Sequence, residues 1–311
     1  MRSADWCLTD DVDEFLAGAG DFLRSRPVVH TSALSVLERL RVLGRAGVGG
    51  RVPVLGRLEE AGEVGAFFYR FLPGGLTVSA LTSGQADGLA ARLAALGHSL
   101  PFVSADHDTA AAFAEAWSRH TGATPVLRVR MHLYRLGTLT PPDPFPAGRG
   151  RIMGEADHEH LMRWCREFAA DVGEDVVVDA RSWAGTRFAE KRYTLWETPD
   201  GTPVSMAGVN PMVAGMVRVD PVYTPAHLRG HGYAGAVTAA VSRAARAAGA
   251  REVVLYTNAA NPTSNALYRR LGYVRVTDWA VYDFSYPAPE AAAPEAAAPE
   301  AAALEAADPR S

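Results

Sequence analysis

The chain has few cysteines and no long apolar run, and both shortages narrow what it can be. The two cysteines among 311 residues, Cys7 and Cys165, are too few for a disulfide framework and lack metal-ligand spacing. No apolar run approaches about 18 residues, and no basic-then-apolar segment opens the chain. We therefore expect a cytoplasmic protein that is not a membrane protein.

Charge of one sign is also scarce in the body of the chain. Residues 1–147 hold 14 basic and 15 acidic groups, and residues 148–287 hold 16 and 15. The net charge of −4 comes from residues 288–311, which hold 1 and 5. A nearly neutral body predicts no basic face, so nucleic acid is not an expected partner. Lys191 is the only lysine, a bias that we attribute to a genome rich in G and C.

Proline-rich segments divide the chain. Residues 140–150 hold four prolines and break every regular pattern, which predicts a linker. Repeated Ala-Ala-Ala-Pro-Glu units near the C-terminus can form neither a continuous helix nor a core. We expect an N-terminal α+β domain at residues 1–139, a mixed α/β domain at 151–286 and a disordered tail at 287–311.

Hydrophobic periodicity and turn residues predict the elements of both domains. The predicted helices are 11–24, 32–45, 83–96, 107–120, 155–172, 179–191, 232–248 and 262–271. The predicted strands are 64–72, 76–82, 124–136, 151–154, 193–198, 203–209, 214–224, 252–257, 273–276 and 279–286.

A glycine-bearing loop between a predicted strand and a predicted helix is the main functional signal. The strand at 214–224 leads into Arg229-Gly230-His231-Gly232-Tyr233-Ala234, where the helix begins. Such a loop offers unpaired backbone N–H groups and the positive end of a helix dipole, which together bind phosphate.

The same loop also fits the dinucleotide fingerprint Gly-x-Gly-x-x-Gly, at Gly230, Gly232 and Gly235. That fold needs further βαβ units and an acidic residue at the end of the next strand. Here the next strand ends in Thr257-Asn258, and the body of the chain closes soon afterwards. The context therefore argues against a dinucleotide site.

The alternative pattern Arg-x-x-Gly-x-Ala, at Arg229, Gly232 and Ala234, resembles the pyrophosphate-binding signature of the GNAT acetyltransferase superfamily. Val222-Tyr223-Thr224 is similar to the strand that holds the pantetheine arm in that family. Asn261-Pro262 and Asn265-x-x-Tyr268-x-x-x-Gly272-Tyr273 match its second motif. The resemblance covers about residues 150–286 and implies a GNAT-like acyl-CoA N-acyltransferase fold, a mixed α/β sheet. The N-terminal domain has no such loop, and we hypothesise that it is a degenerate second copy.

The resemblance implies acetyl-CoA as the co-substrate, with no metal, and it implies roles for individual residues. The backbone N–H of Val222 would donate to the thioester carbonyl, and Tyr268 would be the acid for the CoA thiolate. The alternative is that Tyr268 is a core tyrosine on an amphipathic helix. The residues implied to contact acetyl-CoA are Val222, Tyr223, Thr224, Arg229, Gly230, His231, Gly232, Tyr233, Ala234, Asn258, Asn261 and Asn265.

The general base is open. Side chains alternate along a strand, so Arg218, Asp220 and Val222 share one face unless a bulge intervenes. Asp220 and Glu197 are candidate bases, but both could be structural carboxylates, and a water chain is a third possibility.

Four acidic residues between the first two helices of this domain could attract a cationic amine, although a solvated loop explains them equally well. They are Asp171, Glu174, Asp175 and Asp179.

The sequence thus predicts an N-acetyltransferase that transfers acetyl to a primary amine of a small molecule or peptide. Direct attack in a ternary complex is expected, because no cysteine or serine lies in a nucleophile motif. The chain would act as a monomer or homodimer. A non-catalytic acyl-CoA-binding sensor or partner module is the alternative. A tandem-domain aminoacyl or peptidyl transferase would need a basic RNA-facing surface, which the charge balance does not support.

Overall fold

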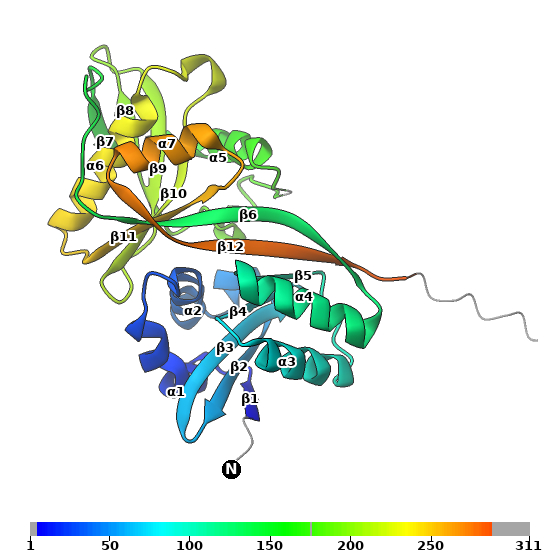
Figure 1. Ribbon diagram of the computed structural model, residues 1–311. Helices are drawn as coiled ribbons and strands as arrows, with labels where there is room; N and C mark the ends of the chain where they lie inside the picture. The colour runs from blue at the N-terminus through cyan, green and yellow to red at the C-terminus, as the bar shows by residue number, and fades with distance from the viewer. Residues whose placement is uncertain (1–4, 175, 288–311) are drawn as a thin grey trace, which may run out of the picture.

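The computed structural model of the protein describes residues 5–174 and 176–287. Within these residues, twelve strands form one mixed sheet in the order β1-β2-β3-β4-β5-β12-β6-β11-β10-β9-β8-β7, with helices on both faces (Figure 1). The strands are β1 (Asp5–Thr9), β2 (Val52–Glu60), β3 (Glu63–Leu72), β4 (Leu76–Val78), β5 (Phe102–Asp106), β6 (Thr124–Leu136), β7 (Arg149–Ile152), β8 (Arg192–Glu197), β9 (Pro203–Val209), β10 (Met216–Tyr223), β11 (Glu252–Asn258) and β12 (Tyr273–Ser285). The α-helices are α1 (Val12–Ser25), α2 (Thr31–Leu43), α3 (Ser83–Ala95), α4 (His107–Thr121), α5 (His158–Asp171), α6 (Tyr233–Ala247) and α7 (Pro262–Arg270).

Two halves of the chain run through a similar order of elements. We call β1 to β6 the N-terminal half and β7 to β12 the C-terminal half. In each half, helical structure follows the first strand, and then come three strands, a helix, a strand, a second helix and a last strand. The parallel pair β4 and β5 in the first half corresponds to β10 and β11 in the second. This repeated order is what a second, degenerate copy of one fold predicts.

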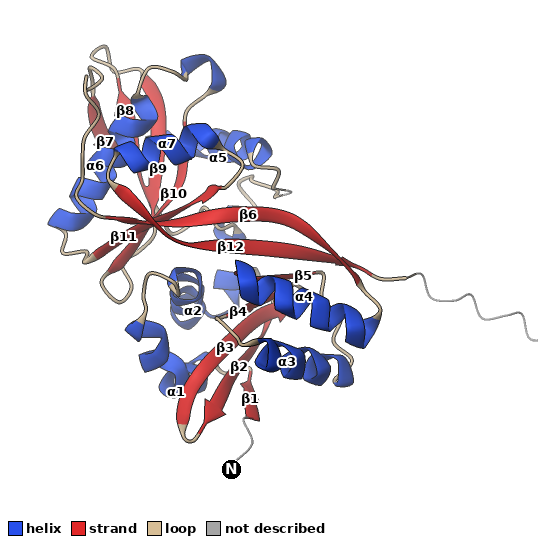
Figure 2. Cartoon of the chain, in the orientation of Figure 1, coloured by secondary structure: helices blue, strands red, loops and turns tan. Residues whose placement is uncertain are grey.

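The two halves exchange their last strands. β6, from the N-terminal half, pairs with β11, and β12, from the C-terminal half, pairs with β5. β6 and β12 also pair with each other from one end to the other, and Figure 2 shows these long strands side by side between the halves. The sheet runs without interruption through both halves, so strand pairing does not show where one domain ends and the next begins. The domain limits expected from sequence therefore stay a prediction.

The helices cover the two faces of the sheet in separate groups. On one face, α1 and α2 pack against residues such as Met216 and Val254, and α5 packs against residues such as Tyr223. On the other face, α6 and α7 pack on Val217 and Val253, while α3 and α4 cover the N-terminal strands. Adjacent residues of a strand point to opposite faces, which separates Met216 from Val217. We call the two sides the α2/α5 face and the α6/α7 face.

Several expectations about elements need correction. The helix expected at 179–191 is wrong, because only a 3-10 turn forms there, at Trp183–Gly185. The Asp179 carboxylate accepts hydrogen bonds from the N–H groups of Arg181 and Ser182, a local turn that competes with a helix. The strands expected at 273–276 and 279–286 are one strand, β12. Apart from Pro287, the expected disordered tail lies outside the described residues.

Among the described residues, no helix has the length and apolar character that crossing a membrane requires.

Candidate active site

The parallel strands β10 and β11 separate partway along their length. They pair for three rungs, the last of which joins Arg218 to Val254. Beyond that rung β10 stays with β9 as far as Tyr223, while β11 stays with β6 as far as Asn258. We call the gap between the diverging strands the β10–β11 opening.

A bulge in β10 decides which side chains reach each face of this opening. Val219 lies opposite Val209 and Val222 lies opposite Ala207, so three steps on β10 match two steps on β9. The bulge therefore intervenes, and Arg218 and Asp220 do not share a face with Val222. The Val222 side chain packs with the α6/α7 cluster, while Asp220 contacts residues of the α2/α5 face.

The bulge also directs the backbone of Val222 into the opening. The carbonyl of Tyr223 accepts a hydrogen bond from Ser205 Oγ of β9 at 2.9 Å. Successive backbone groups of a strand point in opposite directions, so the N–H and C=O of Val222 point away from β9. β11 has already left this side, which frees these groups for a ligand. An extended ligand with amide and carbonyl groups would satisfy them.

The predicted phosphate loop leads from the end of β10 to the N-terminus of α6. Gly230 and Gly232 have φ of 86° and 81°, a left-handed conformation that glycine adopts without strain. Gly232 is the N-cap of α6, and no side chain caps this end of the helix. The first N–H groups of α6, including those of Tyr233 and Ala234, are therefore available to an anion.

Two side chains of the loop hold its shape. Arg229 Nε donates to the carbonyl of Thr224 at 3.0 Å, and its guanidinium forms an ion pair with Asp171 at the end of α5. The His231 ring stacks on Tyr233, with centroids 5.6 Å apart. Arg229 therefore ties the loop to β10 and α5, and its charge is partly neutralised before any ligand binds.

Three asparagines predicted to contact the cofactor build the turn between β11 and α7. Asn261 caps α7 by accepting from Ser264 N at 3.0 Å, and Asn258 Oδ1 accepts from Ala260 N at 2.8 Å. The buried Asn265 amide donates to the carbonyls of Asn258, at 3.0 Å, and Asn261, at 2.7 Å. Their side chains thus hold α7 in place beside the opening, which is a structural role.

Tyr268 belongs to the apolar cluster that contains Val219 and Val222 beside the opening. Its side chain is buried between the rings of Tyr134 and Tyr273, with centroids 6.5 and 6.0 Å away. Burial raises the pKa of Tyr268 well above its usual range, so the phenol stays protonated at neutral pH. Within the described part of the chain its hydroxyl forms no hydrogen bond. It is available as a donor to a ligand.

Asp220 lies in a partly buried ion cluster on the α2/α5 face. Its carboxylate contacts Lys191 Nζ at 2.5 Å and Arg187 at 2.7 Å, and Arg187 also binds Glu174 at 2.7 Å. The cations outweigh the effect of burial and hold the pKa of Asp220 far below its usual range. Such a weakly basic carboxylate does not suit the predicted role of general base.

Lys191 connects the bulge to the rest of this face. Its side chain is 4% exposed, and Nζ also donates to the backbone carbonyl of Asp220 at 3.0 Å. Burial, assisted by Arg187 and Arg218, lowers the pKa of Lys191 to about 8 even though Asp220 opposes the shift. Sequence reasoning missed this residue. Its signal was that a single lysine remains in a chain whose other basic residues are arginines.

Glu197, the other candidate base, lies away from the opening. It ends β8, where the pairing partner is Pro203 at the start of β9, and its carboxylate binds Arg151 Nε at 2.6 Å. The side chain is 7% exposed. This placement fits a structural ion pair that joins β7 to β8.

The acidic residues between α5 and β8 do not form a free rim. Asp171 pairs with Arg229, Glu174 pairs with Arg187, and the Asp179 carboxylate accepts backbone N–H groups. Asp175 lies outside the described residues. The described members are thus neutralised or hydrogen-bonded, which favours the structural interpretation.

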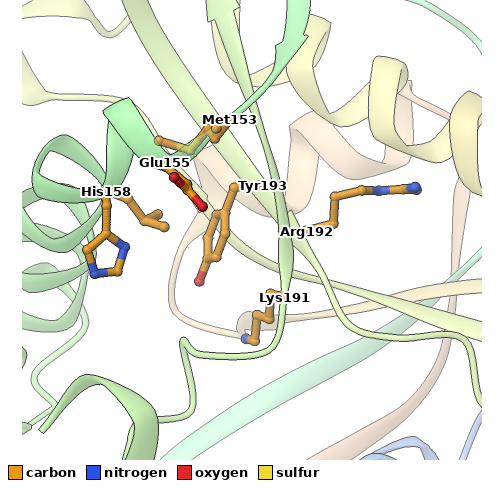
Figure 3. A pocket seen from close by; sticks show the side chains of 8 residues that line it. Met153, Glu155, His158, Lys191, Arg192 and Tyr193 are labelled. Atoms are coloured by element: carbon orange, nitrogen blue, oxygen red, sulfur yellow. The ribbon is translucent and has the colours of Figure 1, made fainter.

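A cavity of about 590 Å³ lies between α5 and the start of β8. Figure 3 shows Lys191 and Tyr193 on its β8 side, with Arg192 pointing away from both, and His158 on the side of α5. Lys191 thus lines the cavity and also contacts Asp220 of β10. No group of three or more potential metal ligands occurs within residues 5–174 and 176–287.

Comparisons with known proteins agree with this geometry. The model of the acetyltransferase (GNAT) family matches residues 157–273. No curated protein sequence matches the chain.

Solved structures share the fold over most of the chain. A tandem GNAT protein from the clavulanic acid biosynthesis pathway superposes with a TM-score of 0.55 and 16% identity, over 93% of this chain and 100% of its own. A GNAT-family acetyltransferase from Colwellia psychrerythraea superposes with a TM-score of 0.55 and 10% identity, over 91% of this chain and 100% of its own. A GCN5-related N-acetyltransferase from Sphaerobacter thermophilus superposes with a TM-score of 0.51 and 17% identity, over 89% of this chain and 94% of its own. The expected mixed α/β fold with two related halves is confirmed.

Proposed function

Because residues 157–273 are a domain of the GNAT acetyltransferase family, we propose that the chain transfers acetyl from acetyl-CoA to a primary amine. The observation that carries the proposal is the β10–β11 opening beside the uncapped N-terminus of α6. The free backbone groups of Val222 suit the amide-rich pantetheine arm. The N–H groups at the start of α6 suit its pyrophosphate.

The amine attacks the thioester directly in a ternary complex. The nitrogen lone pair forms the new C–N bond at the carbonyl carbon, and the carbonyl oxygen becomes an oxyanion near the Val222 N–H. Collapse of this intermediate breaks the C–S bond and releases CoA as a thiolate. The amine loses its proton to solvent, since Asp220 and Glu197 are both held in ion pairs.

Tyr268 donates a hydrogen bond to the departing sulfur. Its pKa lies above its usual range, whereas a free thiol has a pKa near about 8.5. A phenol with a raised pKa remains protonated and stabilises the thiolate as a donor, and a full proton transfer is less favourable. This interaction forms only as the C–S bond breaks, so it accelerates the chemical step without strengthening CoA binding.

The proposal is tested with purified full-length protein, acetyl-CoA and a panel of primary amines. We expect CoA to raise the melting temperature and at least one amine to release free thiol above the hydrolysis background. Mass spectrometry should find an acetylated amine in that reaction. CoA binding without transfer to any amine would favour the alternative, a non-catalytic acyl-CoA-binding module. Absence of CoA binding would contradict both.

A further inference from the structure

Among the described residues, the α2/α5 face of the β10–β11 opening carries a cation that forms no ion pair, Arg218. Arg187 and Lys191 are matched by Asp220 and Glu174 in the ion cluster. Arg218 is the remaining cation, and no carboxylate among the described residues lies within 4.0 Å of it. In the described part of the chain, its guanidinium donates one hydrogen bond, to Ser32 Oγ at 3.4 Å. A partly buried guanidinium in this position attracts an anion.

Arg218 lies at the point where the opening begins, because it forms the last rung between β10 and β11. Ser32 belongs to the first turn of α2, a helix whose N-terminus has no side-chain cap. The N–H groups of that turn and the positive end of the helix dipole therefore lie beside the same guanidinium.

Tyr256 adds an independent sign of a missing ligand. It lies on β11, two residues beyond the last rung, on the same face as Val254. Its hydroxyl is buried beside Ser32 and, within the described residues, makes no hydrogen bond of good geometry. Burial raises the pKa of Tyr256 to about 12, against the opposing effects of Ser32 and Arg218, so it remains a protonated donor. A buried donor without an acceptor is costly and rare in folded proteins.

The acceptor must approach the thioester from this face. On the opposite face, α6 and α7 cover the opening, and that side is where the phosphate loop delivers the cofactor. The guanidinium of Arg218, the phenol of Tyr256 and the hydroxyl of Ser32 then meet the incoming molecule, and among the described residues none of them is paired with a carboxylate. We propose that the acceptor carries a carboxylate or phosphate group close to its amine, and that Arg218, Tyr256 and the first turn of α2 bind this group. The inference rests on the proposed function and names the class of its substrate.

Matched acceptor pairs test the inference. The carboxylate arm compares α-amino acids with their carboxamides, and the phosphate arm compares phosphoethanolamine with ethanolamine. We expect kcat/KM to favour the anionic member of one arm by about 10- to 100-fold, the effect of a charged hydrogen bond. Arg218→Met should remove the preference, because it lowers kcat/KM for the anionic member of a pair more than for its neutral partner. Arg243→Met, which removes an exposed arginine of α6, should keep the preference.

A binding measurement separates failure of the inference from failure of the proposed function. With CoA at saturation, inorganic phosphate or an N-acetylamino acid should raise the melting temperature of the wild type and of Arg243→Met. The same additions should have little effect on Arg218→Met and a reduced effect on Tyr256→Phe. Equal transfer to neutral and anionic amines would overturn the inference, as would anion stabilisation that survives Arg218→Met. A chain that does not bind CoA would instead overturn the proposed function.

Discussion

The two halves of this chain differ at the N-terminus of the helix that follows the first parallel strand. In the N-terminal half, side chains cap the N-terminus of this helix, α3. Thr82 caps α3 and exchanges hydrogen bonds with Gln85, and Leu81 N donates to Thr109 Oγ1 of α4 at 3.0 Å. In the C-terminal half, α6 begins at Gly232 with no side-chain cap.

This difference explains why only one half is a candidate for catalysis. The N-terminal half caps α3 with a capping box and joins Leu81 to α4, so it leaves fewer N–H groups there for a phosphate. The C-terminal half has left those groups free and has separated β10 from β11. The N-terminal half instead contributes α2, which packs on Met216 and Val254 beneath the opening.

The largest expected effect concerns the ion cluster, which has no counterpart in β4, a strand of Leu-Thr-Val. Asp220→Asn removes the carboxylate shared by Lys191 and Arg187. We expect a loss of about 3 kcal/mol in the free energy of unfolding, because a buried cation is left unpaired. Urea denaturation measures it. Glu38→Gln breaks an exposed pair with Arg41 and should cost about 0.5 kcal/mol. Equal losses of stability in Asp220→Asn and Glu38→Gln would contradict the burial of Lys191 against Asp220.

The hydroxyl of Tyr268 provides the next test, on turnover. Tyr268→Phe should lower kcat by about 10²-fold, at the lower end of what a positioned acid contributes, while the Kd for CoA stays the same. The matched control is Tyr273→Phe, whose buried hydroxyl already pairs with Ser242 at 2.8 Å. Similar kcat values for the two variants in a thiol-release assay would remove Tyr268 from the mechanism.

Local patterns predicted the residues of the candidate site but not all of its geometry. The order of β10, the loop, α6, β11 and α7 follows from periodicity and glycine placement, and so does the position of Tyr268. The exchange of β6 and β12 could not be predicted, because two similar halves offer each last strand two equivalent partners. The bulge after Val219 is a property of strand pairing, which no spacing in β10 reveals. Lys191 was missed because its partner, Asp220, is 29 residues away in sequence.

Lys191 also predicts a dependence of stability on pH. Its pKa is about 8 in the folded state and about 10.5 in the unfolded chain. Between these values the unfolded chain binds more protons, so stability should rise with pH, by up to about 1.4 kcal/mol per pH unit. Chemical denaturation at pH 8 to 10.5 measures the slope. Lys191→Met should lack this contribution to the slope of stability against pH. Identical slopes in the wild type and the variant would show that Lys191 is not its source.

The smallest expected effect compares the two helix N-termini directly. Gly232→Asp places a carboxylate where the C-terminal half has none, and we expect the Kd for CoA to rise about tenfold through repulsion of the pyrophosphate. Gly232→Asn also places a side chain on the left-handed backbone of residue 232, but it adds no charge. The difference in the Kd for CoA between the two variants therefore measures the electrostatic effect. Thr82→Ala should cost about 1 kcal/mol of stability and leave the Kd for CoA unchanged. Calorimetric titration with CoA measures all three variants. A weaker Kd in Thr82→Ala would mean that the N-terminal half also binds the cofactor, and the contrast between the halves would then fail.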